Sequence, residues 1–187
     1  MEDVQRNQAR LGSDAANEQF ARLYDSEMPR IYQYLCYRVD SQGEAEDLTA
    51  DVFQRALRQW PRVHASLESP RAWLFTVATN RLTDYYRQQP TRCTAPLDDR
   101  FDLASSQPDP ETEAIRREET DTLLSNLQQM SERDRSVLTL RFAGGLDHRE
   151  IGQVLGISEG ASAVALLRAL RRLREMYEEE QGDEQGT

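Results

Sequence analysis

Apolar residues recur at spacings of three and four along most of the chain, which is the periodicity of helices that bury one face. The first such face is formed by Phe20, Tyr24, Met28, Ile31 and Leu35. Alternating apolar and polar positions, the pattern of half-buried strands, form no run of useful length. The sequence therefore predicts an all-α protein.

Two further helices are delimited by capping residues and prolines. Ser41, followed three residues later by Glu44, is a capping-box pattern for a second helix, which we expect Pro61 to end. Residues 62–69 form a short irregular link, RVHASLES. A Ser-Pro pair then begins a third helix, and its core stripe contains Leu74, Ala78, Leu82 and Tyr85.

Three helices are predicted after residue 130, each preceded by a residue that can cap its first turn. The capping residues are Ser131, Asp147 and Ser158. Glycines end the first two of these helices, at Gly144–Gly145 and at Gly156. The last helix opens with the letters SEGASAVALLRALRRLRE.

Composition divides the helices between two small domains. Residues 91–119 contain three prolines and many acids but few periodic apolar positions, so they predict a flexible acidic linker. We expect an N-terminal extension at 1–17 and a helical bundle at 18–90 before this linker. A helix-turn-helix domain at 120–175 and an acidic tail at 176–187 are expected after it, and the segment EEEQGDEQGT at 178–187 is expected to be disordered.

Charge bears on the class of partner. The chain has 187 residues and a net charge of -10, and all 23 basic residues are arginines. Non-specific binding to nucleic acid is driven by basic side chains that displace counterions from phosphates. The acidic balance therefore argues against a protein that coats nucleic acid by itself.

The cysteines indicate whether a metal site is expected, and the apolar runs indicate whether the chain enters a membrane. Cys36 and Cys93 are not spaced as a metal pair and have only His64 and His148 beside them, so we expect no metal and no cofactor. No secretion signal opens the chain, and no run approaches the ~18 apolar residues of a membrane span. We expect a cytoplasmic protein without membrane insertion.

The segment from Arg149 to Leu173 has the organisation of a helix-turn-helix, in which a short helix and a turn present a longer helix to a DNA groove. An ordinary helical hairpin would give the same pattern. Base-reading side chains are sparse, because residues 161–165 are only Ala, Ser and Val. The first basic residues of the last helix are Arg168 and Arg171. Its capped N-terminus can still offer backbone N–H groups to a phosphate.

The second helix carries Glu44, Asp47 and Asp51 on one face. Such a run of acids is usually a solvated surface. The alternative is a docking face for a basic partner, with Phe53 as an apolar anchor.

The third helix mixes aromatic, amide and arginine side chains at Trp73, Asn80, Arg81, Tyr85, Tyr86 and Arg87. Aromatic rings can stack on unpaired bases while arginines hold phosphates. The alternative is a set of core aromatics with a polar flank. Neither block contains a nucleophile beside a base or a glycine-rich phosphate loop, so we expect no enzymatic activity.

In order and spacing, these segments resemble the bacterial RNA polymerase sigma factors of the extracytoplasmic-function group, within the sigma-70 family, which keep only sigma regions two and four. The resemblance to region two rests on LYDSEMPRIYQYLCYRV, AEDLTADVFQRAL and PRAWLFTVATNRLTDYYRQ. The resemblance to region four rests on LLSNLQQMSERDRSVLTLRFAGGLDHREIGQVLGISEG. It covers the chain from Phe20 to Arg174 apart from the linker.

The resemblance implies a sigma factor that binds core RNA polymerase, through its beta-prime and beta subunits, and directs initiation at promoters. The acidic helix would dock on a beta-prime coiled coil through Glu44, Asp47, Asp51 and Phe53. The link and the third helix would recognise the minus-ten element and hold a flipped base. Residues implied for that element are Arg62, His64, Ser66, Trp73, Asn80, Arg81, Asp84 and Arg87.

The minus-thirty-five element would be contacted by the second domain, through Arg149, Ser158, Glu159, Ala161, Arg168 and Arg171. Promoter DNA and an anti-sigma factor or other regulator are further implied partners. Members of the family commonly follow SEG with a Thr-Val-Lys-Ser-Arg type of run, whereas this chain has ASAVA. We therefore expect weak readout of the minus-thirty-five element.

Two other functions stay open at this point. A stand-alone helix-turn-helix regulator would bind duplex DNA without polymerase, although the acidic charge and the first block argue against it. A degenerate sigma-like protein would bind only other proteins.

Overall fold

The computed structural model describes the backbone of residues 2–88, 120 and 122–184, and the side chains of residues 14–88, 120 and 122–179. Its named helices are α1 (Glu2–Cys36), α2 (Gln42–Val63), the 3-10 helix η1 (His64–Ser66), α3 (Pro70–Gln88), α5 (Glu132–Phe142), α6 (His148–Leu155) and α7 (Glu159–Glu184). Residues 122–129 are also helical. No strand occurs in this part of the chain, so the predicted all-α class is confirmed.

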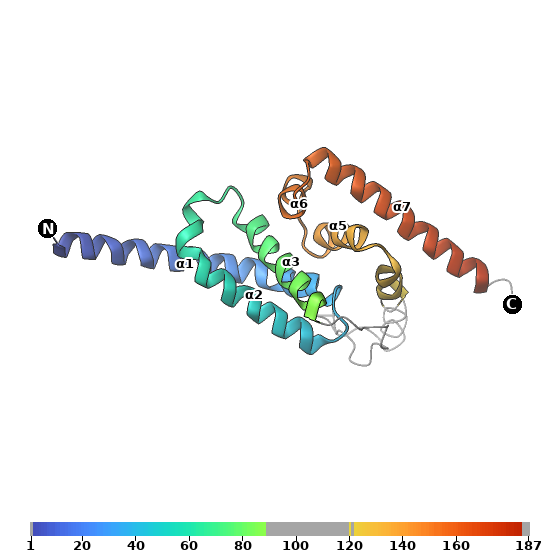
Figure 1. Ribbon diagram of the computed structural model, residues 1–187, viewed down its shortest axis with the longest axis horizontal. Coiled ribbons are helices and arrows are strands. Elements are labelled where there is room, and N and C mark those ends of the chain that lie inside the picture. Colours follow the sequence, from blue (N-terminus) through green and yellow to red (C-terminus); the bar gives the residue numbers. More distant parts are fainter. Residues whose placement is uncertain (1, 89–119, 121, 185–187) are drawn as a thin grey trace, which may run out of the picture.

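The helices form two bundles that follow the order of the sequence. Figure 1 shows α1, α2 and α3 side by side in one bundle and α5, α6 and α7 in the other. In the first bundle the ring of Tyr34 meets the ring of Phe75 edge to face, with centroids 5.6 Å apart. The predicted core stripe of α3 is buried throughout. Two small helical units of this kind are what the hydrophobic pattern predicted.

The predicted caps explain where most helices begin. Asp147 accepts the Glu150 N–H at 2.8 Å, and the Glu150 carboxylate accepts the Asp147 N–H at 3.1 Å. This reciprocal pair is a complete capping box and starts α6. Serine hydroxyls accept a backbone N–H three residues on at the starts of α2, α3, α5 and α7, namely Ser41, Ser69, Ser131 and Ser158.

The expected end of the second helix at Pro61 is wrong. Helix α2 continues through Pro61 to Val63, and the His64 N–H still donates to the Trp60 carbonyl. A proline removes one N–H and strains the preceding turn. Here it lies two residues before the helix end and is exposed, while the neighbouring Trp60 is buried. Packing of that tryptophan therefore outweighs the local preference.

Both expected terminal segments are more helical than the pattern indicated. Helix α1 is already formed before Phe20, and the Ala16 carbonyl accepts a hydrogen bond from the Trp60 indole at 2.8 Å. Helix α7 continues to Glu184, so the expectation of disorder from residue 178 is wrong as far as residue 184, and residues 185–187 lie outside the described residues. An Arg174–Glu178 pair at 2.7 Å supports that extension. The predicted linker at 91–119 lies outside the described residues.

The two bundles pack against each other. Helix α3 lies along α6, and one hydrophobic cluster joins buried residues of both bundles. At the contact, a Cβ atom added to Gly144 would lie 2.8 Å from the Phe75 ring. Only glycine allows this approach, which sets how closely α5 and its turn lie against α3.

Candidate nucleic-acid interface

Helices α6 and α7 meet at the corner of the predicted helix-turn-helix. Gly156 ends α6 in the left-handed conformation, with φ 66° and ψ 35°. The Ile157 N–H then donates to the Gly152 carbonyl at 3.0 Å. A Cβ atom added to Gly152 would lie 2.7 Å from the Ile157 carbonyl oxygen, so the corner also requires glycine inside α6. The sequence pattern did not single out Gly152.

The outer surface of α7 is apolar near its start. Val164 is 48% exposed and Leu167 is 62% exposed, and Ala161 is half-buried. Ser162 is fully buried, with its hydroxyl 3.3 Å from Nδ1 of His148. The positions from which a second helix would read bases therefore carry short apolar side chains.

Polar side chains lie at the N-terminal end of α7 and again further along the helix. The Ser158 hydroxyl accepts the Ala161 N–H at 3.2 Å, which occupies one backbone donor of the first turn. Glu159 is exposed beside it and places a negative charge at the end that would otherwise attract phosphate. Arg168 and Arg171 are exposed further along the helix.

Arg149, expected among the DNA contacts of the second domain, is ion-paired with Glu68 of the first bundle. Glu68 belongs to the link between α2 and α3, where the minus-ten residues were expected. The structure thus brings together two sites that the sequence assigned to different parts of a DNA ligand. Both side chains are largely exposed, so the pair by itself stabilises the contact little.

A line of ion pairs joins α2 to α3. Asp51 pairs with Arg55 at 3.1 Å and with Arg81, and Arg55 also pairs with Asp84 at 3.5 Å. Arg87 extends the line, 2.8 Å from Asp84. Burial favours a higher pKa for Asp51, but the hydrogen bonds and charges of Arg55 and Arg81 outweigh it and lower the pKa of that carboxyl.

This line changes the interpretation of the predicted sites. Asp51 was expected to face a protein, whereas Arg81 and Asp84 were expected to face DNA. Instead Asp51 binds Arg81, and Asp84 binds Arg55, which is the other partner of Asp51. The sequence contained a signal for Arg55, which lies four residues after Asp51 on the same helix face. It contained none for Arg81, because the two helices meet only in the folded chain.

The remaining members of the acidic face differ in exposure. Asp47 is exposed, and Glu44 is half-buried in the first turn of α2. Phe53 is only 6% exposed and packs edge to face on Tyr24, with centroids 4.7 Å apart. The expectation of a surface anchor at Phe53 is therefore corrected. Two residues correspond to about 200° of helical rotation, so Phe53 points away from the face of Asp51.

An aromatic group supports the link after α2. The His64 ring stacks on Trp60 at 5.6 Å, and Trp73 lies 5.8 Å from Trp60 on the other helix. His64 Nδ1 lies 2.9 Å from the Trp60 carbonyl. Trp73 is only half-buried. Arg62 is exposed in the last turn of α2, Ser66 on the link and Asn80 on α3. The link thus presents exposed polar side chains next to the packed rings of Trp60, His64 and Trp73.

Neither a metal site nor a membrane-spanning helix occurs among the described residues. Within the described residues, no three His, Cys, Asp or Glu side chains are grouped as a metal site. No helix in that part of the chain combines the length and apolar character needed to cross a bilayer.

Two family models match the chain, one in each bundle. Residues 23–91 match the model for Sigma-70 region 2, and residues 121–173 match the model for Sigma-70, region 4. Together they cover more than half of the chain, in the order in which the two bundles occur.

Sequence relatives and a solved structure of similar fold are also sigma factors. The chain is 32% identical to the ECF RNA polymerase sigma factor BldN of Streptomyces coelicolor, over 92% of this chain and 64% of that protein's length. It is 30% identical to the ECF RNA polymerase sigma factor SigX of Bacillus subtilis, over 86% of this chain and 84% of SigX. The fold is similar to the sigma factor RpoE of Bartonella quintana, solved with the anti-sigma factor NepR. That match has a TM-score of 0.67 and 18% identity, and covers 86% of this chain and 98% of RpoE.

Proposed function

The chain belongs to the extracytoplasmic-function group of the sigma-70 family, and we propose that it binds core RNA polymerase and directs transcription initiation at specific promoters. The observation that carries this proposal is the presence of both regions in one chain, each on its own helical bundle. A regulator that acts alone would need only the second bundle. The acidic charge of -10 supports dependence on polymerase, because it weakens binding to free DNA.

Docking on the polymerase is assigned to the exposed acids of α2. Asp47 is the best placed of these, since its carboxylate is exposed and a basic partner can approach it. Asp51 contributes less directly, because Arg55 and Arg81 already bind its carboxylate. The beta-prime and beta subunits are the proposed partners.

Recognition of the minus-ten element is assigned to the link and to the exposed side of α3. Arg62, Ser66 and Asn80 offer donors on that surface, and the half-buried ring of Trp73 offers a stacking face. Extraction of a base from the duplex costs a few kcal/mol, so this recognition needs strand opening assisted by the polymerase. Arg81 and Asp84 act mainly by fixing α3 against α2, and Arg87 pairs with Asp84 on α3 itself.

Contact with the minus-thirty-five element is assigned to the second bundle, as a weak interaction. Arg168 and Arg171 can reach phosphates from the exposed side of α7. Arg149 becomes available only when its pair with Glu68 breaks. The alanines and valine at the start of α7 offer no hydrogen bonds to base edges.

A second function is favoured by one observation, the exposed Val164 and Leu167 on α7. Exposed apolar side chains on a recognition helix suit a protein partner better than a phosphate backbone. An anti-sigma factor is a suitable partner, since the Bartonella sigma factor of similar fold was solved with one. A chain that binds only such a protein would be a degenerate sigma factor.

Run-off transcription separates these functions. Purified core polymerase is given a library of random promoter sequences, with and without the full chain, and the RNA 5′ ends are sequenced. The proposal predicts new start sites with shared upstream sequences only when the chain is present. Identical transcripts in both reactions would contradict it and leave the protein-binding function.

A variant pair tests the docking surface in the same assay. Asp47→Arg should weaken core binding about tenfold, a change of about 1.4 kcal/mol, and reduce transcription in proportion. Glu18→Arg is the control, because it makes the same charge change on an exposed position of α1. Equal loss in the two variants would show that total charge matters and not the α2 face.

A further inference from the structure

The outward face of α7 carries apolar side chains along its first turns. Val164 is 48% exposed and Leu167, one turn further along, is 62% exposed, whereas Ala169 on the other side of the helix is fully buried. Among residues 160–167, the one side chain that forms hydrogen bonds is Ser162, and it is buried against His148. This part of the outward face therefore meets a ligand through carbon atoms alone.

Basic side chains follow the apolar ones on the same face. Residues 160–174 include four arginines and no acid. Arg168 and Arg171 lie four and seven residues after Val164, so they share its face and lie about 6 and 10 Å further along the helix axis. Both are exposed. The face of Val164 thus joins an apolar start to positive charge that is complementary to the phosphates of a duplex.

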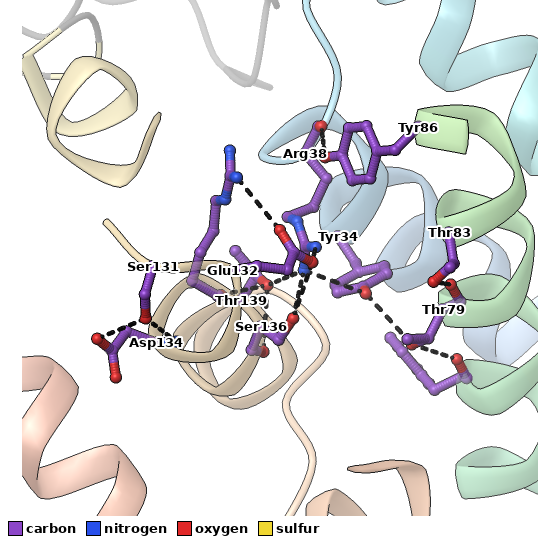
Figure 2. Close-up of polar contacts among 12 residues, drawn as sticks. Tyr34, Arg38, Thr79, Thr83, Tyr86, Ser131, Glu132, Asp134, Ser136 and Thr139 are labelled. Carbon is purple, nitrogen blue, oxygen red and sulfur yellow. Dashed lines mark hydrogen bonds and ion pairs between the residues drawn. The ribbon is translucent and has the colours of Figure 1, made fainter. Parts of the chain in front are cut away.

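The side of α7 that faces α5 is engaged within the fold. Arg172 of α7 pairs with the Asp134 carboxylate in the first turn of α5. Figure 2 shows Asp134 beside Ser131, whose hydroxyl lies 2.8 Å from the same carboxylate oxygen, and Glu132 paired with Arg38, which follows α1. This anchored turn of α5 helps to fix the orientation of α7. Arg172 is therefore bound to α5, in contrast to the arginines on the outward face.

An apolar side chain meets one matching group on the major-groove edges of the bases. Guanine, cytosine and adenine present hydrogen-bond donors and acceptors there, whereas thymine presents a C5 methyl group beside its O4 acceptor. Covering a donor or acceptor with an apolar side chain removes its hydrogen bond with water and provides no replacement. Contact with a methyl group instead removes apolar surface of both partners from water. An apolar helix face in the major groove therefore favours thymine.

We propose that α7 recognises thymine methyl groups in the minus-thirty-five element, with Val164 as the central contact and Leu167 beside it, while Arg168 and Arg171 bind phosphates. This inference rests on the proposed sigma-factor function. A protein partner would also cover the two apolar side chains, but the arginines on the same face suit a duplex. Burial of one methyl group is worth about fourfold in affinity, which corresponds to about 0.8 kcal/mol. Each thymine is thus selected modestly.

Replacement of single thymines by deoxyuridine tests this inference, because uracil lacks only the C5 methyl group. Promoters are first selected from the random library with core polymerase and the full chain. Duplexes with deoxyuridine at each thymine of the upstream element then compete for the polymerase-bound chain. We expect a loss of about fourfold in affinity at one or more of these positions. Deoxyuridine in the spacer between the two elements is the control and should cause no loss.

A variant of the chain connects the methyl group to Val164. Val164→Ala should lower the discrimination between thymine and deoxyuridine, because one side-chain carbon in place of three leaves less surface for the methyl group. Leu170→Ala is the matched control and should keep the full discrimination. Leu170 is also exposed on α7, at 37%, but it lines a groove with Phe142 of α5, about 120° around the helix from Val164. Equal discrimination in the two variants would overturn the assignment to Val164.

The possible outcomes distinguish this inference from the proposed function. Upstream elements that lack thymine, or that bind equally well with deoxyuridine, would overturn recognition of methyl groups and leave the sigma-factor activity in place. The apolar face of α7 would then be available to a protein partner. Failure to obtain any promoter that depends on the chain would contradict the proposed function, and the inference with it.

Discussion

Asp51 joins α2, to which polymerase contact is assigned, to α3, to which DNA contact is assigned. Its carboxylate accepts from Arg55 on α2 and from Arg81 on α3, and it is only partly exposed. Charge-assisted hydrogen bonds of this kind are stronger than neutral ones. Asp51 therefore stabilises the surface to which we assign the polymerase and DNA contacts.

We predict that Asp51→Asn lowers the free energy of unfolding by about 1–2 kcal/mol at pH 7, because it removes charged hydrogen bonds. The pKa of Asp51 is lowered in the folded chain. Its contribution is then complete above the unfolded pKa of about 3.9 and is lost as the pH falls through the lower folded value. Urea unfolding at several pH values measures this. Asp47→Asn, at an exposed acid of the same helix, is the control. A difference between the two variants that persisted at low pH would contradict the assignment.

At the scale of residues, local chemistry was predictable and distant pairing was not. The caps at Ser131 and Asp147 were found because a capping residue and its N–H lie three residues apart. Arg81 lies 30 residues from Asp51, and Arg38 lies 94 residues from Glu132, so no spacing rule could connect them. Phe53 was misplaced for another reason, since its position relative to Asp51 already puts it on another face of α2.

At the scale of elements, the corner between α6 and α7 depends on Gly152. We predict that Gly152→Ala lowers the free energy of unfolding by about 1–3 kcal/mol, because its methyl group would meet the Ile157 carbonyl oxygen. Gly160→Ala is the control. Nothing lies within 4 Å of its added Cβ atom, and alanine favours the helix by about 0.5–1 kcal/mol. Thermal unfolding of both variants makes the comparison. Equal melting temperatures would contradict the requirement for glycine at position 152.

The apolar start of α7 gives a second prediction at this scale. Val164→Arg should tighten binding of the polymerase-bound chain to minus-thirty-five duplex and steepen its salt dependence by about 0.9 per added phosphate contact. Gln19→Arg adds the same charge on the exposed side of α1 and serves as the control. The measurement is a salt titration of duplex affinity. If both variants had the wild-type slope, this face of α7 would be turned away from DNA and available to a protein.

Most elements followed from the sequence, and the exceptions have physical causes. The apolar periods and the caps located the starts of α2, α3, α5, α6 and α7. The end of α2 was wrong because buried Trp60 stabilises a helix that Pro61 disfavours. The expectation of a disordered tail was wrong because the glutamates of this segment, one of them paired with Arg174, extend α7. At the end of α2 a packing contact outweighed the proline that predicted a helix end. At the end of α7 helix propensity outweighed the acidic composition that predicted disorder.

At the scale of the whole molecule, the sequence predicted two separate domains and the structure has two bundles in contact. Surfaces of the link and of α6 that would each touch promoter DNA touch one another instead. Nothing in the hydrophobic pattern indicated this, because each bundle buries its own stripe. The acidic charge and the closed arrangement act in the same direction, since both disfavour binding to DNA by the free chain.

We expect this chain to select promoters only in the presence of core polymerase. Fluorescence anisotropy can test it with a labelled promoter duplex selected from the transcribed library and a shuffled duplex of equal length. The free chain should bind both duplexes weakly and equally, in the range of about 10⁻⁴ to 10⁻⁶ M that is typical of non-specific contacts. With core polymerase, the promoter duplex should be bound far more tightly than the shuffled one. Tight, selective binding by the free chain would contradict this dependence on core polymerase.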